Sequence, residues 1–273
     1  MATLELRGTA PLRRVREISE RLLLPAFGLL TLFGGWTLVS SLDLVPGHFL
    51  PSPFAVLATM VELTHEPYAG SLLQEHVQAS LDKFAVSYLL SVAIGVPLGL
   101  LMGRFRVLDW IVTPIVEAFR YTPPIAWVPF SVLWFGTGFL AQTLVIFAAT
   151  FAPCLVNAYR GVRLIDRTLL EVAQGLGAGR LRTMTDVLLP GALPHIVAGL
   201  RVSAGFGWQS LIGAELIVGS TGLGYMIVQG ESNVAPTVVL AGMVAIGLVG
   251  ATMDHVLRAV ESRIRRNWGS SGL

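Results

Sequence analysis

Charged side chains are scarce in this sequence. Asp, Glu, Lys and Arg make up 13% of its 273 residues, whereas a soluble domain carries roughly 25% charge. Lysine occurs once, at Lys83, and cysteine occurs once, at Cys154. A single cysteine excludes a disulfide framework within the chain and a thiolate metal cluster. The 5 histidines show no metal-ligand spacing, so we expect no bound metal.

Long runs of apolar residues dominate the sequence. Hydrophobic residues make up 53% of it, and its mean hydropathy is +0.69. The first run is longer than the ~7–15 residues of a signal-peptide core, which predicts an uncleaved span. The sequence thus predicts an all-α membrane protein with about six transmembrane helices, since a helix needs roughly 20 apolar residues to cross a bilayer. These spans are expected near 22–42, 81–102, 110–135, 139–159, 194–218 and 237–257.

The arginines mark one side of the membrane. They gather in residues 1–21, directly after the second run, in residues 160–193 and after the sixth run, while the alternate connections hold almost no basic residue. Connections rich in Arg and Lys stay in the cytoplasm. We therefore expect a cytoplasmic N-terminal tail (1–21), a membrane domain (22–265) with a cytoplasmic loop at 160–193, and a cytoplasmic C-terminal tail (266–273).

Two of the predicted spans carry small residues at every fourth position, which lets helix backbones approach closely in lipid. These positions are Gly95, Gly99 and Gly103 in the second span, and Gly199, Ser203 and Gly207 in the fifth. The third span is interrupted by Pro123 and Pro124, which break the helical hydrogen-bond ladder. Broken backbone at membrane depth is tolerated only against protein or a water-filled cavity. The third span is therefore expected to line a pore.

The loop at 160–193 is the one multiply charged segment in the interior of the chain. Asp166 is expected to cap a helix over residues 167–176. The glycines at 175, 177 and 179 then allow a sharp turn, and a second helix is predicted over residues 180–189.

The second helix of this loop is expected to present an apolar face, formed by Leu181, Met184, Val187 and Leu188. We expect Pro190, Gly191 and Pro194 to end the helix and to start the next span at a defined angle. Two short helices with an apolar ridge and no lipid to cover it predict a docking element. An ordinary solvated loop is the alternative.

Six residues of the loop have a spacing that resembles the cytoplasmic EAA motif of binding-protein-dependent ABC importer permeases. That motif consists of E-A-A, any three residues, G, any nine residues and then I-x-L-P. The six residues are Glu171, Ala173, Gly177, Val187, Leu189 and Pro190. The chain departs from the motif at Val172, which replaces the middle alanine, and at Val187, which replaces the isoleucine. Further segments resemble the nitrate, sulfonate and taurine branch of these permeases: Leu50–Pro53, Gly95–Gly99, Pro123–Pro129, Leu133–Gly136, Ala214–Ile217 and Gly222–Tyr225.

This resemblance implies the type I ABC importer permease fold in a multi-pass protein of the bacterial inner membrane. It implies a homodimer of permeases, two cytoplasmic ATPase subunits and an external, periplasmic solute-binding protein. The chain has no G-x-x-x-x-G-K-[ST] phosphate loop, so we expect it to be non-catalytic, with ATP and magnesium on the partner subunits. No nucleic acid partner is expected. The expected cargo is a small anion: a sulfonate such as taurine, nitrate or an aromatic acid.

The resemblance also implies which residues of the loop contact the ATPase. The expected coupling residues are Glu171, Ala173, Gly177, Leu181, Met184, Val187, Leu189 and Pro190. For the substrate path, the expected residues are Tyr121, Trp127, Gln209 and Glu215. A carboxylate repels an anion, so Glu215 is expected to pack helices or to form an outer gate. Glu117 and Arg120 lie three residues apart on one helical face and are expected to neutralise each other.

The sequence leaves two alternative classes of protein: an ion- or proton-coupled secondary carrier, and a membrane-embedded enzyme. Carriers often show broken helices in matching halves; this chain shows no internal repeat, and a docking loop would have no purpose in a carrier. An enzyme would need clustered His, Asp or Cys at the membrane face, and the sequence offers no such cluster.

Overall fold

Helices account for nearly all of the described chain. The computed structural model describes residues 10–47 and 49–269, and the one β bridge among them joins Tyr68 to Ser71. In chain order the helices are α1 (Ala10–Ser41), α2 (Pro53–Glu62), α3 (Leu73–Arg104), α4 (Arg106–Arg120), η1 (Pro124–Trp127), α5 (Val128–Phe135), α6 (Phe139–Arg163), α7 (Arg167–Gly175), α8 (Arg180–Thr183), η2 (Met184–Leu188), α9 (Leu189–Val218), α10 (Leu223–Ser232) and α11 (Pro236–Gly269). The predicted all-α class is confirmed.

Five helical segments of the described chain are long and apolar enough to cross a membrane: Leu23–Ser41, Leu73–Arg104, Phe139–Arg163, Arg180–Val218 and Pro236–Arg266. The remaining expected span, 110–135, is not one helix. It divides into α4, the short 3-10 turn η1 and α5. The predicted break is thus confirmed, because Thr122 precedes a proline and is disfavoured in the helical region, and Pro123 and Pro124 have no backbone N–H to donate.

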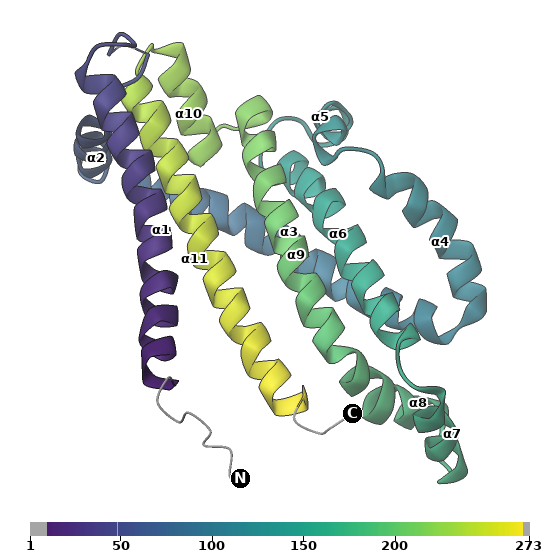
Figure 1. Cartoon of the computed structure of the whole chain (residues 1–273). Helices are drawn as coiled ribbons and strands as arrows, with labels where there is room; N and C mark the ends of the chain where they lie inside the picture. Colours follow the sequence, from purple (N-terminus) through teal and green to yellow (C-terminus); the bar gives the residue numbers. More distant parts are fainter. Residues whose placement is uncertain (1–9, 48, 270–273) are drawn as a thin grey trace, which may run out of the picture.

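The centre of the molecule is formed by α3, α6 and α9. Figure 1 shows α6 and α9 running side by side while α3 crosses behind them. These helices contact one another at the small residues that recur at every fourth position of the sequence. A Cβ on Gly99 would lie 2.9 Å from Ala158 Cβ and closer still to the Leu155 carbonyl oxygen, and one on Gly207 would overlap Thr150. The predicted packing role of these glycines is confirmed.

Gly99→Ala is expected to destabilise the protein by about 1–3 kcal/mol, because the added methyl group forces α3 away from α6. Gly247→Ala in α11 is the matched control, since no heavy atom lies within 4 Å of the position of its Cβ. Both substitutions replace glycine by alanine within a helix. The melting temperature of the purified protein in detergent should fall for Gly99→Ala and not for Gly247→Ala; equal melting temperatures would contradict this packing.

The helices that surround this centre leave much apolar surface uncovered. Leu30 of α1 is 72% exposed, and the apolar window of α1 has no buried residue. A soluble monomer rarely exposes contiguous apolar patches larger than a few hundred Å². The exposed face of α1 is therefore typical of a helix that contacts lipid.

The ends of the long helices fall into two groups. In Figure 1 the start of α1, the end of α11 and the loop that carries α7 and α8 lie at one end of the molecule, while α2, α5 and α10 lie at the other. This grouping agrees with the arginine distribution, which predicts both tails and the loop 160–193 on the same side of the membrane.

Candidate functional site

The first helix of the loop, α7, begins where the sequence predicts. The carboxylate of Asp166 accepts hydrogen bonds from the backbone N–H and the hydroxyl of Thr168, each at 2.9 Å. These two bonds, the backbone one first, hold the pKa of Asp166 below its usual value. The cap therefore stays ionised at neutral pH, next to the positive end of the helix dipole.

Gly177 forms the turn between the two short helices. Its φ of +77° lies in the left-handed region, which favours glycine because other residues carry a Cβ that clashes there. Its N–H donates to the Gln174 carbonyl oxygen, and the N–H of Ala178 donates to the Ala173 carbonyl oxygen, both at 2.9 Å. Of the three glycines expected to form this turn, Gly177 alone has the left-handed conformation. Gly179 has an ordinary φ of −68° and precedes α8.

The second helix of the loop does not end at Pro190, so that prediction is wrong. After α8 the chain makes one π turn, η2, in which the N–H of Leu189 donates to the Met184 carbonyl oxygen five residues back, and it continues directly into α9. Pro190 is the second residue of α9 and has no N–H to donate to the helical ladder. The π turn directly before it changes the hydrogen-bond ladder at the point where the proline would disturb it. The loop is thus joined to the α9 span by continuous helix.

The apolar residues expected on one docking face in fact point two ways. Leu188 is buried in a cluster with Ala158, Ala192 and neighbouring residues of α3, α6 and α9, and Met184 packs against that cluster. Leu181 is 79% exposed. A π turn between these residues rotates their side chains relative to the regular helix that the expectation assumed.

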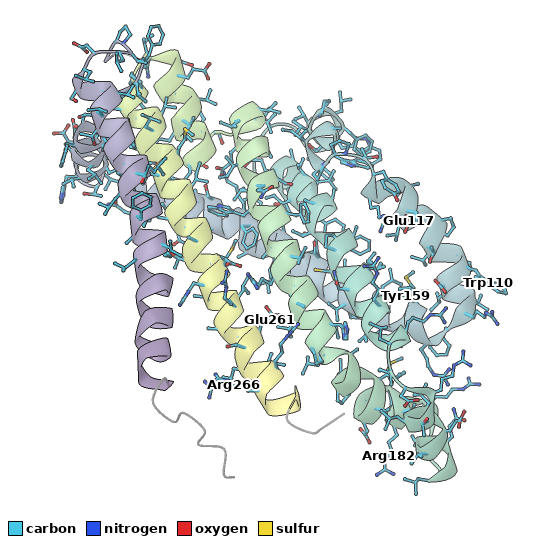
Figure 2. All side chains as sticks on the ribbon, viewed as in Figure 1. Trp110, Glu117, Tyr159, Arg182, Glu261 and Arg266 are labelled. Atoms are coloured by element: carbon cyan, nitrogen blue, oxygen red, sulfur yellow. The ribbon has the colours of Figure 1, made fainter. Side chains whose placement is uncertain are left out.

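The outward apolar surface of the loop is therefore built mainly by side chains outside the expected face. The large apolar residues exposed there are Leu164, Leu169, Val172, Leu176, Leu181 and Leu189. Between α7 and the start of α9 lies a groove of about 470 Å³, lined by Leu169, Val172, Ala173, Leu176, Asp186, Val187, Pro190, Gly191 and Pro194. Of the expected coupling residues, Ala173, Val187 and Pro190 line this groove, while Glu171, Gly177 and Leu189 are exposed and are not among the residues that line it. Figure 2 shows this part of the chain, with Arg182 labelled, projecting at the end of the molecule.

The break between α4 and η1 places an ion pair beside an aromatic cluster. Arg120 Nε lies 3.0 Å from Glu117 Oε2, which confirms the expected pairing, and an Arg120 terminal nitrogen donates to the Tyr121 hydroxyl at 3.0 Å. Trp127 stacks on Phe119 with ring centroids 5.3 Å apart. A cavity of about 310 Å³ lies here, lined by Ile115, Val116, Phe119, Arg120, Trp127, Leu144, Phe147, Ala148, Phe151 and Ala152.

The structure does not bring the four expected substrate-path residues together. Trp127 lines the cavity at the break, and Tyr121 is exposed next to it. Gln209 lies on the exposed side of α9. Glu215 is 1% exposed.

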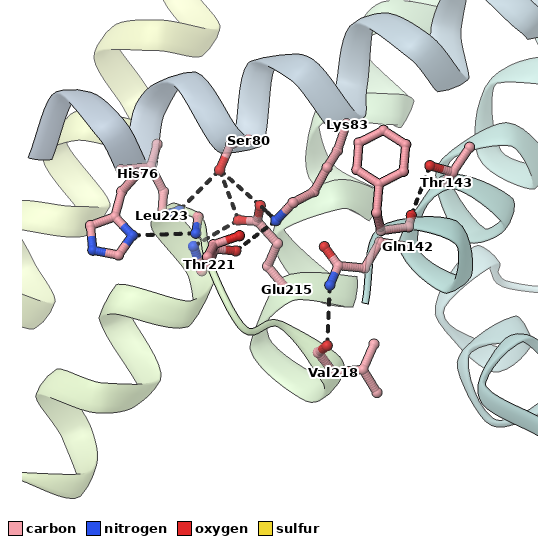
Figure 3. Close-up of polar contacts among 12 residues, drawn as sticks. His76, Ser80, Lys83, Gln142, Thr143, Glu215, Val218, Thr221 and Leu223 are labelled. Carbon is pink, nitrogen blue, oxygen red and sulfur yellow. Dashed lines mark hydrogen bonds and ion pairs between the residues drawn. The ribbon is translucent and has the colours of Figure 1, made fainter. Parts of the chain in front are cut away.

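Glu215 is held in a buried polar cluster at the far end of α9, shown in Figure 3. Its carboxylate accepts from Lys83 Nζ at 2.8 Å, from Ser80 Oγ at 2.8 and 3.0 Å, and from the backbone N–H of Gly224 at 2.9 Å. Lys83 also donates to the Thr221 carbonyl oxygen at 2.6 Å. Buried charges of this kind are stable when they are paired and fully hydrogen-bonded.

The same cluster fixes the start of α10. The N–H of Leu223 donates to Ser80 Oγ at 2.9 Å, and the N–H of Gly222 donates to His76 Nδ1 at 3.3 Å. Three residues of α3 therefore hold the turn that follows α9. The sequence interpretation missed Lys83 as the partner of Glu215; a lone lysine within an apolar run was the available signal.

A second charged network, also missed, joins α9 to α11. Arg201 lies 2.6 Å from Asp254 and 3.3 Å from Glu261, and α11 adds its own pairs from Arg258 to Asp254 at 2.7 Å and from Arg265 to Glu261 at 3.2 Å. Asp254 and Arg201 fall inside two predicted spans. Ionisable residues within a span usually have a structural or functional partner, and this was the signal by which the network could have been predicted.

Long apolar helices around a break at membrane depth, with a projecting two-helix loop at one end, define a multi-pass membrane protein. Residues 95–266 match the family described as binding-protein-dependent transport system inner membrane component. The chain belongs to this family, whose members are transport components, as the EAA spacing implied.

Particular relatives agree with this membership. The chain is 36% identical over 248 residues to the taurine transport system permease protein TauC of Escherichia coli (strain K12), covering 90% of both. It is 32% identical to the putative aliphatic sulfonates transport permease protein SsuC of Bacillus subtilis (strain 168), with 92% of this chain and 87% of that protein covered. An inward-facing structure of the MetNI methionine ABC transporter superposes with a TM-score of 0.57 at 25% identity, over 69% of this chain and 95% of that chain. The type I importer permease fold fits the structure.

Proposed function

We propose that this chain is the membrane-spanning subunit of an ATP-driven importer of small anions in the bacterial inner membrane. Two copies form the translocation path, two separate cytoplasmic ATPase subunits hydrolyse ATP, and an external solute-binding protein delivers the cargo. The observation that carries the proposal is the projecting loop: its EAA spacing, the left-handed Gly177 and the uncovered leucines lie together at one end of a membrane protein.

The loop is the docking element for the ATPase. Leu169, Val172, Leu176 and Leu181 supply apolar contact area, and Glu171 supplies a polar contact beside them. Arg180 and Arg182 add ion pairs, but exposed pairs contribute only about 0–1 kcal/mol each. The apolar contacts therefore dominate docking.

Transmission from the loop to the pore runs through continuous helix. ATP binding brings the two ATPase subunits together, and each carries its loop with it. Because α8, η2 and α9 form one helical path, a displacement of Arg180–Leu188 moves α9 as a lever. Met184 and Leu188 anchor this lever to the helices around it, so the membrane part responds as a body and changes the side from which the path is open.

The substrate path runs past the break between α4 and η1. Trp127 and Tyr121 lie at this break. Gln209 lies four residues before Gly213, whose Cβ position is 3.0 Å from Ile125 of η1, so we place Gln209 on the same path. Glu215 acts at a distance from the substrate: it holds the start of α10 and so fixes the outer end of the path.

The cargo is a small anion, and sulfonates are the class that we propose first. The proteins named above are described as permeases for taurine and for aliphatic sulfonates, and a relative from Leptolyngbya laminosa, 30% identical over 88% of this chain, is described as a nitrate import permease protein, NrtB. Selectivity resides mostly in the external binding protein.

The test is transport by the reconstituted complex of permease, its ATPase and its binding protein in liposomes. We expect labelled taurine to accumulate when ATP is present on the ATPase side and the binding protein on the other, with nitrate and benzoate as the comparison anions. Accumulation that needs an ion gradient and no ATP would instead show the secondary carrier and overturn the proposal.

A further inference from the structure

We infer that Arg120 is the anion-recognising residue of a substrate site in the cavity between α4, η1 and α6. This inference rests on the proposed function and names the side chain that meets the cargo inside the membrane. Among the residues that line the cavity, Arg120 alone carries a charge; the others are aliphatic or aromatic. A mostly apolar cavity with one placed polar group is the usual composition of a small-molecule site.

The position of α4 in the membrane keeps this charge away from lipid. The 15 residues of α4 rise at most about 22 Å at ~1.5 Å per residue from the arginine-rich turn before it, so Arg120 lies within the roughly 30 Å hydrocarbon core. Ionisable side chains at that depth almost always face the bundle interior or a water-filled cavity. The side chains of Arg120 and Glu117 are 32% and 44% exposed, and on this ground we assign their open side to the path.

The contacts of Arg120 orient its guanidinium and leave donors for a ligand. Nε is used by Glu117 and one terminal N–H by the Tyr121 hydroxyl, and the guanidinium lies 4.9 Å from the centre of the Tyr121 ring. A guanidinium has five N–H donors. The remaining donors suit two oxygens of one anion, because planar N–H pairs bind carboxylate-like groups through parallel hydrogen bonds.

The cavity also limits the size of the ligand. Its volume of about 310 Å³ is at the lower end of the ~300–1,000 Å³ found for ligand sites. Trp127 stacks on Phe119 and meets Phe130 edge-on at 5.8 Å, which gives the site an aromatic wall. An anion with a short organic part, such as a two-carbon sulfonate, fits both the charge and the volume.

The wall of the cavity depends on how α4 is attached. Its lower end is fixed to α6 by a 3.0 Å hydrogen bond from the Tyr159 hydroxyl to Asp109, and Figure 2 places Tyr159 beside that end and Glu117 near the upper end. The helix is thus tied to α6 below the cavity, while the proline break lies at its upper rim. This arrangement permits the upper end of α4 to move without detaching the helix.

The experiment compares Arg120→Gln and Arg120→Lys with Arg106→Gln, a matched control. Arg106 is a cation on the same helix whose guanidinium lies 5.5 Å from the Trp110 ring, away from the cavity. Two quantities are measured: ATP-driven uptake of labelled taurine by the reconstituted complex, and direct binding of taurine to the permease–ATPase complex without binding protein, with competition by nitrate and benzoate.

For Arg120→Gln we expect both quantities to fall about tenfold or more, since hydrogen bonds to charged groups are among the strong ones. Stimulation of ATP hydrolysis by the loaded binding protein should persist, because the docking loop is intact. Arg120→Lys should be intermediate, since it keeps the charge and loses the paired donors. Arg106→Gln should behave as the wild type.

Three results would decide against the inference. Wild-type uptake and binding in Arg120→Gln would overturn it directly. A fall in melting temperature together with equal losses of uptake and of ATP hydrolysis would show a structural role and overturn it as well. If the wild-type complex transports none of the anions, the proposed function fails, and this inference fails with it.

Discussion

Gly177→Val is expected to reduce ATP-driven uptake by about tenfold or more while the protein still folds and inserts in the membrane. The left-handed conformation of residue 177 costs a residue with a Cβ roughly 1–2 kcal/mol, and a β-branched residue is the least tolerated there. No heavy atom lies within 4 Å of the position of its Cβ. The loss therefore arises from a distorted turn and an obstructed docking surface, and the core stays as it is.

Two variants separate these causes. Gly175→Ala is the matched control, because Gly175 has equally open space but ends α7 in helical conformation; it should transport as the wild type does. Gly177→Asn tests the backbone alone, since asparagine tolerates the left-handed region, and it should retain more activity than Gly177→Val. The measurement is uptake per inserted permease together with the amount of ATPase bound. Wild-type uptake and ATPase binding in Gly177→Val would contradict the coupling role of the loop.

Lys83→Met is expected to lower the stability of the protein by about 3–5 kcal/mol, because it leaves the buried carboxylate of Glu215 without its cation. The remaining donors, Ser80 and the Gly224 N–H, do not replace a charge. In the double variant Lys83→Met, Glu215→Gln, part of this stability should return, since a neutral amide needs no counter-charge.

The thermal unfolding of the four proteins in this cycle, in detergent, measures the coupling between Lys83 and Glu215. Arg258→Gln is the control for the loss of an exposed cation, because 62% of the Arg258 side chain is exposed and its partner Asp254 keeps a second cation, Arg201; it should shift the melting temperature only slightly. Additive effects of Lys83→Met and Glu215→Gln would contradict a direct contact between the two residues.

Local sequence signals predicted the local parts of the loop. Asp166 caps α7 through a residue two positions away, and Gly177 forms a turn that closes within a few residues. Both depend on neighbours in the chain, which the sequence displays. The same holds for the break at Pro123, where the missing donor is a property of the residue itself.

The predictions that failed depend on how distant segments pack. Pro190 resembles a helix stop, but a π turn absorbs its effect, and packing of Leu188 against α6 supports the continuous helix. The same π turn separates Leu181 from Leu188, so Leu181 is exposed while Leu188 is buried. The partner of Glu215 lies 132 residues earlier in the chain, beyond the reach of any local pattern.

The most direct test of the account is photo-crosslinking between the loop and the ATPase subunit. A photoreactive residue replaces Leu176 or Leu181, which are 83% and 79% exposed, and a control replaces Val234, which is also 79% exposed but lies in the turn between α10 and α11 at the other end of the molecule (Figure 1). In membranes that contain the co-expressed ATPase, we expect crosslinks to the ATPase from positions 176 and 181 and none from 234. Crosslinks from position 234, or none from either loop position, would contradict the assignment of this loop as the ATPase-coupling element.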